Sequence, residues 1–337
     1  VGQNCFLDKR APSDLFEYNM IKVYEDKNGN LSADYSAMDK YIHLCGECGF
    51  SENAEIEVFG LFSSWANPDH GFGPLSPEYA DALRVRVQRS EGTLDYLRQG
   101  KDLEWYIQSF ANHCKEKGWN GRVLITGDEP SDPDLFRTSL AKMKGLAPGL
   151  NYKAAINHVD FIDAFGEEIN TFVPFVECYL EKRDVIHAYK AKYPDKKFLW
   201  YVCCGPSHPN TFIGSNLPEA RALAYITMSE NLDGFLRWNY TDMRYPQFRC
   251  GDMNFVYPAG DARPLLSLRY MALKRGIEEY EMMRELKERG KGKIVEQALD
   301  RILINRPVTY EASAAEMVSL SHQDYEDTRK LLLSALS

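Results

Sequence analysis

The sequence lacks several features that point to whole classes of protein. No stretch approaches the roughly 20 apolar residues of a membrane-spanning helix, and we expect no signal peptide in this chain. Lys and Arg number 40 against 49 Asp and Glu, and no long basic run occurs. Because nucleic acids and anionic membranes are bound through clustered Lys and Arg, we expect neither as a partner. The compartment stays open, with bacterial-type cytoplasmic and secreted or periplasmic locations both compatible.

Metal-binding patterns are also scarce. The seven histidines show no close ligand spacing. Cys45 and Cys48 form a C-x-x-C without a second pair, at the end of an amphipathic helix closed by Gly49. We therefore expect no metal and no cofactor. All eight cysteines are interpreted as reduced core residues, with Cys203 and Cys204 packing as small hydrophobes in a strand.

Short β-rich runs alternate with longer amphipathic runs along most of the chain. The candidate strands are Met20–Tyr24, Glu55–Phe62, Arg122–Thr126, Tyr152–Asn157, Phe172–Val176, Lys197–Cys203 and Gly234–Trp238. The candidate helices are Asp34–Cys48, Asp102–Gly118, Asp132–Met143, Glu181–Tyr193, Pro218–Glu230 and Pro264–Arg289. Most of the strands are continuous apolar runs, which is typical of parallel strands buried on both faces. The alternation predicts an α/β fold, a (β/α)₈ TIM-like barrel whose first strand is incomplete or hidden.

Three further segments complete the predicted architecture. They are a hairpin over Val85–Leu97, placed in a loop at the barrel mouth, and tail helices over Ile294–Ile304 and from Ser321 to the end. Ser321 and Asp324 resemble a capping box at the start of the last helix. We therefore predict a catalytic barrel over residues 1–290 and a C-terminal helical extension over 291–337, packed on the barrel.

Two adjacent carboxylates, Asp128 and Glu129, end the apolar run and are followed by Pro130. In a barrel this is the carboxyl end of a strand, where barrel enzymes carry their chemistry. Gly127 is expected to release the strand geometry, so that both acids face the mouth. Two such acids interact, and the one with the raised pKa is a usable general acid. The structural alternative is that Asp128 caps the next helix and Glu129 faces its dipole.

Polar and aromatic residues follow the other candidate strands. The candidate substrate-binding residues are Trp65, Asn157, His158, Tyr201, His208, Trp238, Asn239 and Tyr240. Aromatic faces beside amides suit a sugar, because the ring C–H bonds pack on the aromatic face and the hydroxyls take the polar groups. Each has a structural alternative, Trp238 as a core residue and His208 as an ordinary loop histidine.

Several segments together resemble glycoside hydrolase family 123 and the wider DUF4091 group of barrel domains. They are G-D-E-P at 127–130, W-Y-V-C-C-G-P-S-H-P-N-T-F-I at 200–213, D-G-F-L-R-W-N-Y at 233–240 and G-D-M-N-F-V-Y-P at 251–258. The likeness spans most of residues 20–290. One departure is G-D-M-N-F, where G-D-G-F-L is more usual.

The resemblance implies a retaining β-N-acetylgalactosaminidase that uses substrate-assisted catalysis on a terminal residue of a glycan or glycoconjugate. By that resemblance Glu129 would be the general acid and base, and Asp128 would hold the acetamido N–H and stabilise the oxazolinium. Two alternatives stay open. Glu177, at another strand end, could be a direct nucleophile on a sugar without an acetamido group, or the barrel could bind carbohydrate without catalysis.

Overall fold

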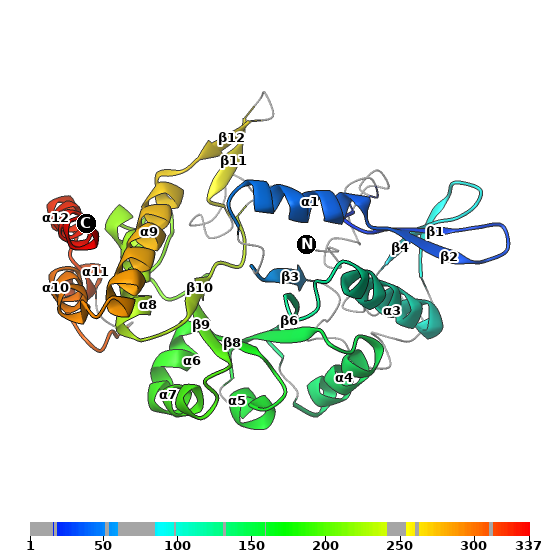
Figure 1. The fold of residues 1–337 in the computed structure, drawn as a ribbon, viewed down its shortest axis with the longest axis horizontal. Coiled ribbons are helices and arrows are strands. Elements are labelled where there is room, and N and C mark those ends of the chain that lie inside the picture. The colour runs from blue at the N-terminus through cyan, green and yellow to red at the C-terminus, as the bar shows by residue number, and fades with distance from the viewer. Residues whose placement is uncertain are drawn as a thin grey trace. The chain divides into compact units, whose positions relative to one another are not determined.

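The chain forms two compact units, Val1–Thr171 and Phe172–Ser337 (Figure 1). The structure, a computed structural model, describes residues 16, 19–50, 54–59, 85–97, 99–130, 133–158, 160–240, 254–259, 263–309 and 313–337. The predicted organisation, a barrel over residues 1–290 with a helical extension after it, stays a prediction. Each unit is described below by itself.

The first unit contains a small mixed sheet. Its strands are β1 (Lys22–Glu25), β2 (Leu31–Asp34), β4 (Arg86–Gln88) and β5 (Leu94–Tyr96), in the order β2-β1-β4-β5. A tight turn joins β1 to β2, because the Asp26 carboxylate accepts the backbone N–H groups of Asn28 and Asn30 at 2.8 Å and Gly29 adopts a φ of 79°. The prediction of Met20–Tyr24 as a barrel strand was therefore wrong, because this run pairs within the small sheet.

The predicted hairpin over Val85–Leu97 is present as β4 and β5, which pair antiparallel. Its place differs from the prediction of a loop insertion, because β4 also pairs in parallel with β1. Arg89 joins the two parts through ion pairs with Glu25 of β1 and with Asp95, the latter at 3.1 Å. The hairpin is therefore one edge of the small sheet.

Three parallel strands of the first unit carry the predicted β/α alternation. They are β3 (Ile56–Phe59), β6 (Val123–Asp128) and β7 (Asn151–Ile156), with β6 between the other two. The helices of this unit are α1 (Ser36–Glu47), α3 (Gly100–Glu116), α4 (Pro133–Leu146) and α5 (Asp160–Phe165). In α3 the side chains of Leu103, Ile107 and Phe110 are buried, as the helical spacing of its apolar residues requires. The three strands and the helices α1, α3 and α4 lie within a few residues of the predicted ones, whereas α5 was not predicted.

The second unit continues the alternation. Its strands are β8 (Thr171–Pro174), β9 (Lys197–Tyr201) and β10 (Gly234–Leu236). The helices α6 (Val176–Glu181) and α7 (Arg183–Lys192) come between β8 and β9, and α8 (Leu217–Ser229) comes between β9 and β10. The strand order is β10-β9-β8 in this unit and β7-β6-β3 in the first, and the division between the units falls in β8. The fold is thus mixed α/β, with parallel strands and helices alternating in each unit. A closed eight-stranded barrel stays a prediction.

The C-terminal part of the second unit is helical. It contains α9 (Leu268–Glu288), α10 (Gly292–Ile302), α11 (Ala314–Met317) and α12 (His322–Leu336), and α10 and α12 pack on α8 and α9 (Figure 1). The predicted tail helices are present, and the Ser321 side chain caps α12 by accepting the N–H of Asp324. The predicted helix Pro264–Arg289 begins later than expected. Its first residues form β12 (Pro264–Leu266), which pairs antiparallel with β11 (Val256–Pro258).

Gly276 sets the close approach of α9 to α8. A Cβ at this position would lie 2.4 Å from the backbone oxygen of Arg221 and 3.2 Å from Cβ of Ala224. We expect Gly276→Ala to lower the free energy of unfolding by about 1–3 kcal/mol, because a backbone atom cannot yield as a side chain does. Denaturation midpoints measure this. Gly145→Ala in α4 is the control, because its Cβ would meet nothing within 4 Å, and equal midpoints for the two variants would contradict the packing.

The cysteines differ from the expectation of core residues. Cys114 and Cys178 are buried, Cys45 and Cys203 are half-buried, and Cys48 and Cys204 are exposed, all six with free thiols. Cys203 and Cys204 follow β9 and do not lie within it. The prediction that all eight cysteines are core residues was therefore wrong.

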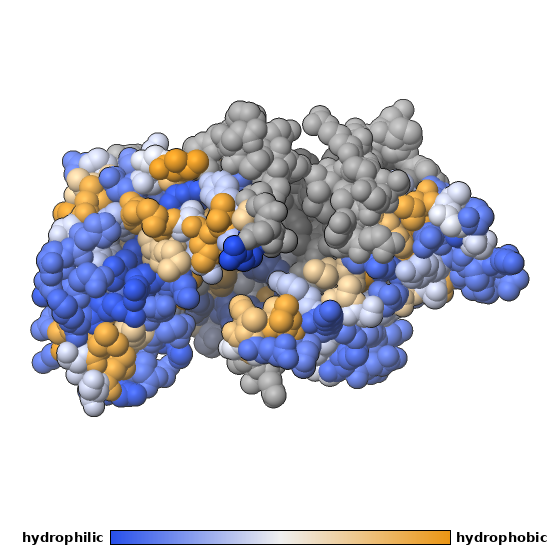
Figure 2. Space-filling model, turned by 90° about the horizontal axis from the view of Figure 1, so that it is seen from above, coloured by the Kyte–Doolittle hydropathy of each residue, from blue (hydrophilic) through white to orange (hydrophobic). Residues whose placement is uncertain are grey.

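The described surface is mostly hydrophilic, with hydrophobic side chains distributed among polar ones on the face seen in Figure 2. The exposed large hydrophobic residues include Leu265, Leu266, Leu268 and Met271, which lie in β12 and at the start of α9. Within the described ranges, no helix combines the length and apolarity needed to cross a membrane.

Candidate active site

Glu129 and Asn157 come together at the carboxyl ends of two neighbouring strands. The register pairs Asp128 of β6 with Ala155 of β7, and the N–H of Glu129 extends the ladder by donating to the Ala155 carbonyl at 2.9 Å. The Asn157 amide then donates to Glu129 Oε2 at 3.4 Å. The prediction that the segment G-D-E-P at 127–130 lies at the end of a strand is confirmed, as far as its backbone is concerned. Gly127 is itself paired with Ala154 in the ladder, so the expectation that Gly127 releases the strand geometry was wrong.

The backbone of Glu129 departs from strand geometry. Its φ is 45°, in the left-handed region that residues with a Cβ avoid. The turn therefore occurs at Glu129 itself, immediately after β6 and before the buried Pro130. Backbone strain of this kind gathers at functional sites.

This geometry predicts an order of stability among variants at Glu129. Glu129→Gly should be about 1 kcal/mol more stable than Glu129→Ala, because Gly occupies a left-handed φ without a Cβ clash. Chemical denaturation of the two proteins measures the difference. The same pair of substitutions at Glu285, inside α9, should give the opposite order, since Gly destabilises a helix interior. An Ala variant at 129 as stable as the Gly variant would argue against the left-handed backbone.

The structure does not support the alternative in which Glu129 is an acid of the first turn of the next helix, α4. The acidic residue in the first turn of α4 is Asp134, which pairs with Arg137 at 2.8 Å. Glu129 lies before α4 and contacts Asn157 instead. For Asp128 the structure describes the backbone only, and its side chain lies outside the described part. Trp65 also lies outside the described residues.

His158, a predicted binding residue, follows Asn157 and is exposed. Its carbonyl accepts the N–H of Phe161 at 3.2 Å, at the beginning of α5. The strand-end segment of the first unit thus combines a carboxylate, an amide and an imidazole.

In the second unit, the segment after β9 holds two of the predicted residues in different settings. Tyr201 is only 3% exposed, and its ring centroid lies 5.2 Å from that of Phe175. His208 is half-buried, and its Nδ1 lies 2.8 Å from Oε2 of Glu219 in α8. The buried Asn210 amide donates to the carbonyls of Cys203 and Pro206, at 3.2 and 2.7 Å.

The residues after β10 present aromatic surface. Trp238 is 42% exposed and Tyr240 is 39% exposed, so the interpretation of Trp238 as a core residue is wrong. Tyr240 packs on Phe255, with ring centroids 5.5 Å apart. Burial of its hydroxyl end raises the pKa of Tyr240, so the phenol keeps its proton and can donate a hydrogen bond. Asn239, which lies between Trp238 and Tyr240 in the sequence, is half-buried.

Two arginines that the sequence did not single out hold these segments. Arg237 donates to the Val202 carbonyl at 3.2 Å, and Arg269 donates to the carbonyls of Thr211 and Asn254, at 2.6 and 2.8 Å. Both guanidinium groups also lie against the Phe255 ring, at 5.2 and 5.5 Å from its centroid. Only Arg237 stood in a segment with a recognisable pattern, D-G-F-L-R-W-N-Y. No local pattern marks Arg269.

Glu177 is not at a strand end. β8 ends at Pro174, and Glu177 is an exposed acid in the first turn of α6, where it faces the positive end of the helix dipole. Its local setting is therefore that of an ordinary helix-start acid.

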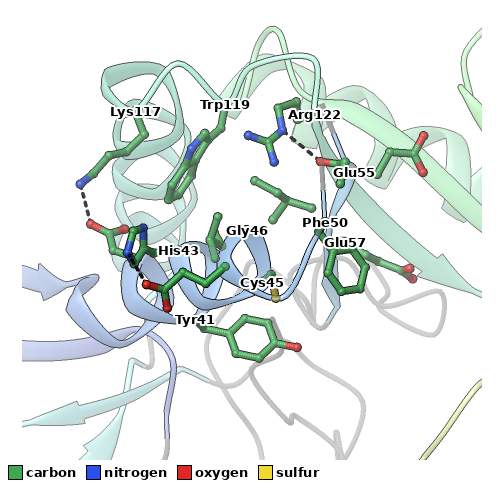
Figure 3. A pocket seen from close by; sticks show the side chains of 15 residues that line it. Tyr41, His43, Cys45, Gly46, Phe50, Glu55, Glu57, Lys117, Trp119 and Arg122 are labelled. Carbon is green, nitrogen blue, oxygen red and sulfur yellow. Dashed lines mark hydrogen bonds and ion pairs between the residues drawn. The ribbon is translucent and has the colours of Figure 1, made fainter. Parts of the chain in front are cut away.

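A cavity of about 770 Å³ lies elsewhere in the first unit (Figure 3). Its lining includes Tyr41, Phe50, Trp119 and Arg122, and Arg122 donates to the Ala54 carbonyl at 3.0 Å. Arg122 and Ala54 precede β6 and β3, so this cavity lies at the amino ends of the strands. Glu129 is at the carboxyl end, and the cavity is therefore not the candidate active site.

No group of three or more His, Cys, Asp or Glu side chains is placed to hold a metal ion within the described part of the chain.

The sequence matches the family model of the glycoside hydrolase 123 catalytic domain over residues 4–286. The chain belongs to glycoside hydrolase family 123. No curated protein matches the sequence.

A solved family 123 glycoside hydrolase from Clostridium perfringens has a similar fold, with a TM-score of 0.63 at 19% identity. The structure of that enzyme was analysed for the details of glycolipid glycan hydrolysis. The match covers 94% of this chain and 57% of the other, so this chain spans little more than half the length of its relative. At this identity the likeness concerns the fold alone.

Proposed function

We propose that this family 123 chain removes terminal β-linked N-acetylgalactosamine by a retaining, substrate-assisted reaction. The observation that carries the proposal is the acid segment at the carboxyl end of β6, with Glu129 in reach of the Asn157 amide. The roles of Asp128 and Glu129 follow from the resemblance of the segment G-D-E-P at 127–130 to the same segment in the family. Glu129 protonates the glycosidic oxygen and then activates water, while Asp128 holds the acetamido N–H.

The chemistry explains why two consecutive acids suit this reaction. The carbonyl oxygen of the substrate's own acetamido group attacks the anomeric carbon, and the bond to the leaving group breaks as Glu129 donates its proton. A cyclic oxazolinium forms, whose positive charge a neighbouring carboxylate stabilises. Water, deprotonated by Glu129, then opens the ring with net retention. No enzyme carboxylate needs to act as the nucleophile.

A panel of nitrophenyl glycosides tests the proposal. We expect turnover of the β-N-acetylgalactosaminide, none of the matched galactoside without the acetamido group, and a β-configured first product by NMR. Equal turnover of the plain galactoside would instead favour a direct enzyme nucleophile. Binding of the sugar without turnover of any glycoside would favour a non-catalytic carbohydrate-binding barrel.

Asp128→Asn tests the second role. We expect kcat to fall by about 10²–10³-fold, the range found when one group that stabilises developing charge is removed. The loss should persist with very acidic leaving groups, because Asp128 acts on the acetamido group and not on the departing oxygen. Turnover at the wild-type rate would overturn this assignment.

A further inference from the structure

Glu219 is a fully buried carboxylate that gathers hydrogen-bond donors from the segment before α8. Its Oε1 accepts the backbone N–H and the side-chain amide of Asn216, at 2.9 and 3.1 Å. Its Oε2 accepts from His208 Nδ1 at 2.8 Å and from the N–H of Asn210 at 3.3 Å. The bond from the Asn216 backbone N–H belongs to the capping box at the start of α8. The bond to His208 has no role in capping the helix.

The contact defines how the His208 ring carries its proton. A carboxylate oxygen accepts hydrogen bonds and cannot donate them, so Nδ1 must bear hydrogen. In the neutral ring Nε2 is then an acceptor. The His208 side chain is 34% exposed, whereas Glu219 is 0% exposed. The carboxylate is thus sealed behind the ring while the imidazole reaches solvent.

The backbone around His208 has supports that do not involve Glu219. Asn210 bonds to the carbonyls of Cys203 and Pro206, and Arg269 bonds to the Thr211 carbonyl. The course of the segment therefore rests on several buried polar groups. Loss of the Glu219 carboxylate should change the ring of His208 more than the path of the chain.

We propose that Glu219 is a positioning residue that holds His208 as the Nδ1–H tautomer, so that Nε2 accepts a hydrogen bond from a sugar hydroxyl. This rests on the proposed function in taking His208 as a sugar-binding residue. Hydroxyl recognition by a neutral imidazole depends on the tautomer, because the other form presents a donor at the same place. The carboxylate–imidazole pair works as similar pairs do behind metal-bound histidines.

The tautomer is measured without reference to activity. Long-range ¹H–¹⁵N spectra of the full chain, recorded above the ordinary imidazole pKa of about 6.5, distinguish Nδ1–H from Nε2–H, and His208→Ala assigns the signals. We expect Nδ1–H in the wild type and a shift toward Nε2–H in Glu219→Gln, whose amide can donate to Nδ1. Asn216→Ala is the matched control, which disturbs the same carboxylate and should leave the tautomer unchanged. Nε2–H in the wild type overturns the proposal, even if Glu219→Gln does not fold.

Kinetics separate positioning from a merely structural role. Glu219→Gln should lower kcat/KM by about tenfold, mainly through KM, the size of effect expected from one lost hydrogen bond. In a His208→Ala background the same substitution should have almost no further effect. An undiminished loss in that background overturns the proposal. If the wild type turns over no glycoside, the proposed function fails, while the spectra still decide whether Glu219 sets the tautomer.

Discussion

Glu129→Gln should lower kcat/KM by about 10²–10⁴-fold on glycosides with poor leaving groups. Gln has the shape of Glu and can keep a contact with the Asn157 amide, which now lies 3.4 Å from Glu129 Oε2. It cannot supply a proton to the departing oxygen. The loss should therefore come from the chemical step, and kcat should fall with kcat/KM.

The leaving group provides the internal check on this loss. With a very acidic phenol the glycosidic bond breaks without a proton, so Glu129→Gln should regain much of the rate of that step. A series of aryl glycosides gives the slope of kcat/KM against leaving-group pKa, which should be steeper for the variant. Asp134→Asn, which changes an exposed acid in the first turn of α4, is the control and should behave as wild type. An equal slope for wild type and Glu129→Gln would remove Glu129 from the acid role.

The sequence was most informative where local pattern and burial coincide. The run that became β6 is apolar up to Thr126, and the run that became β7 is interrupted only by Lys153; the residues of both are buried along most of each strand. That made the end of β6, and hence the position of Glu129, predictable. The departure from strand geometry was expected at Gly127 instead, because glycine leaves an extended backbone more readily than other residues. The structure places it at Glu129.

Pairing between distant segments was not predictable in the same way. The run Met20–Tyr24 has the composition of a strand, but nothing in it indicates whether it joins a barrel or the sheet with β4 and β5. The same holds for the partners of single side chains. The Asn216–Glu219 pair has the spacing of a capping box, yet its second use, toward His208, depends on the path of the segment after β9. Arg269 likewise reaches Thr211 across a large separation in sequence.

Arg221→Met should be the most destabilising single change in the helical part of the second unit. Arg221 in α8 donates through Nε to Glu279 Oε2 at 2.9 Å, and Glu279 in α9 is 0% exposed. Burial opposes the charge on Arg221, but the hydrogen bonds and charge of Glu279 raise the pKa of the guanidinium overall. Removing it leaves Glu279 with Tyr225, at 2.9 Å, and Arg329, at 3.5 Å. We expect a loss of about 3 kcal/mol in the free energy of unfolding, as when one partner of a buried ion pair is removed.

The comparison that decides the cause uses two further variants. Arg284→Met in α9 removes exposed pairs with Glu281 and Glu288 at 2.8 and 2.6 Å, and should cost less than about 0.5 kcal/mol. Arg221→Met combined with Glu279→Leu should recover much of the stability lost in Arg221→Met alone, because no buried charge is then left with a lost partner. Denaturation midpoints for the three proteins measure both effects. If Arg221→Met lowered the free energy of unfolding no more than Arg284→Met, the Arg221–Glu279 pair would not be desolvated. The packing of α8 on α9 would then not depend on this pair. If the double variant were less stable still, shape and not charge would set the loss.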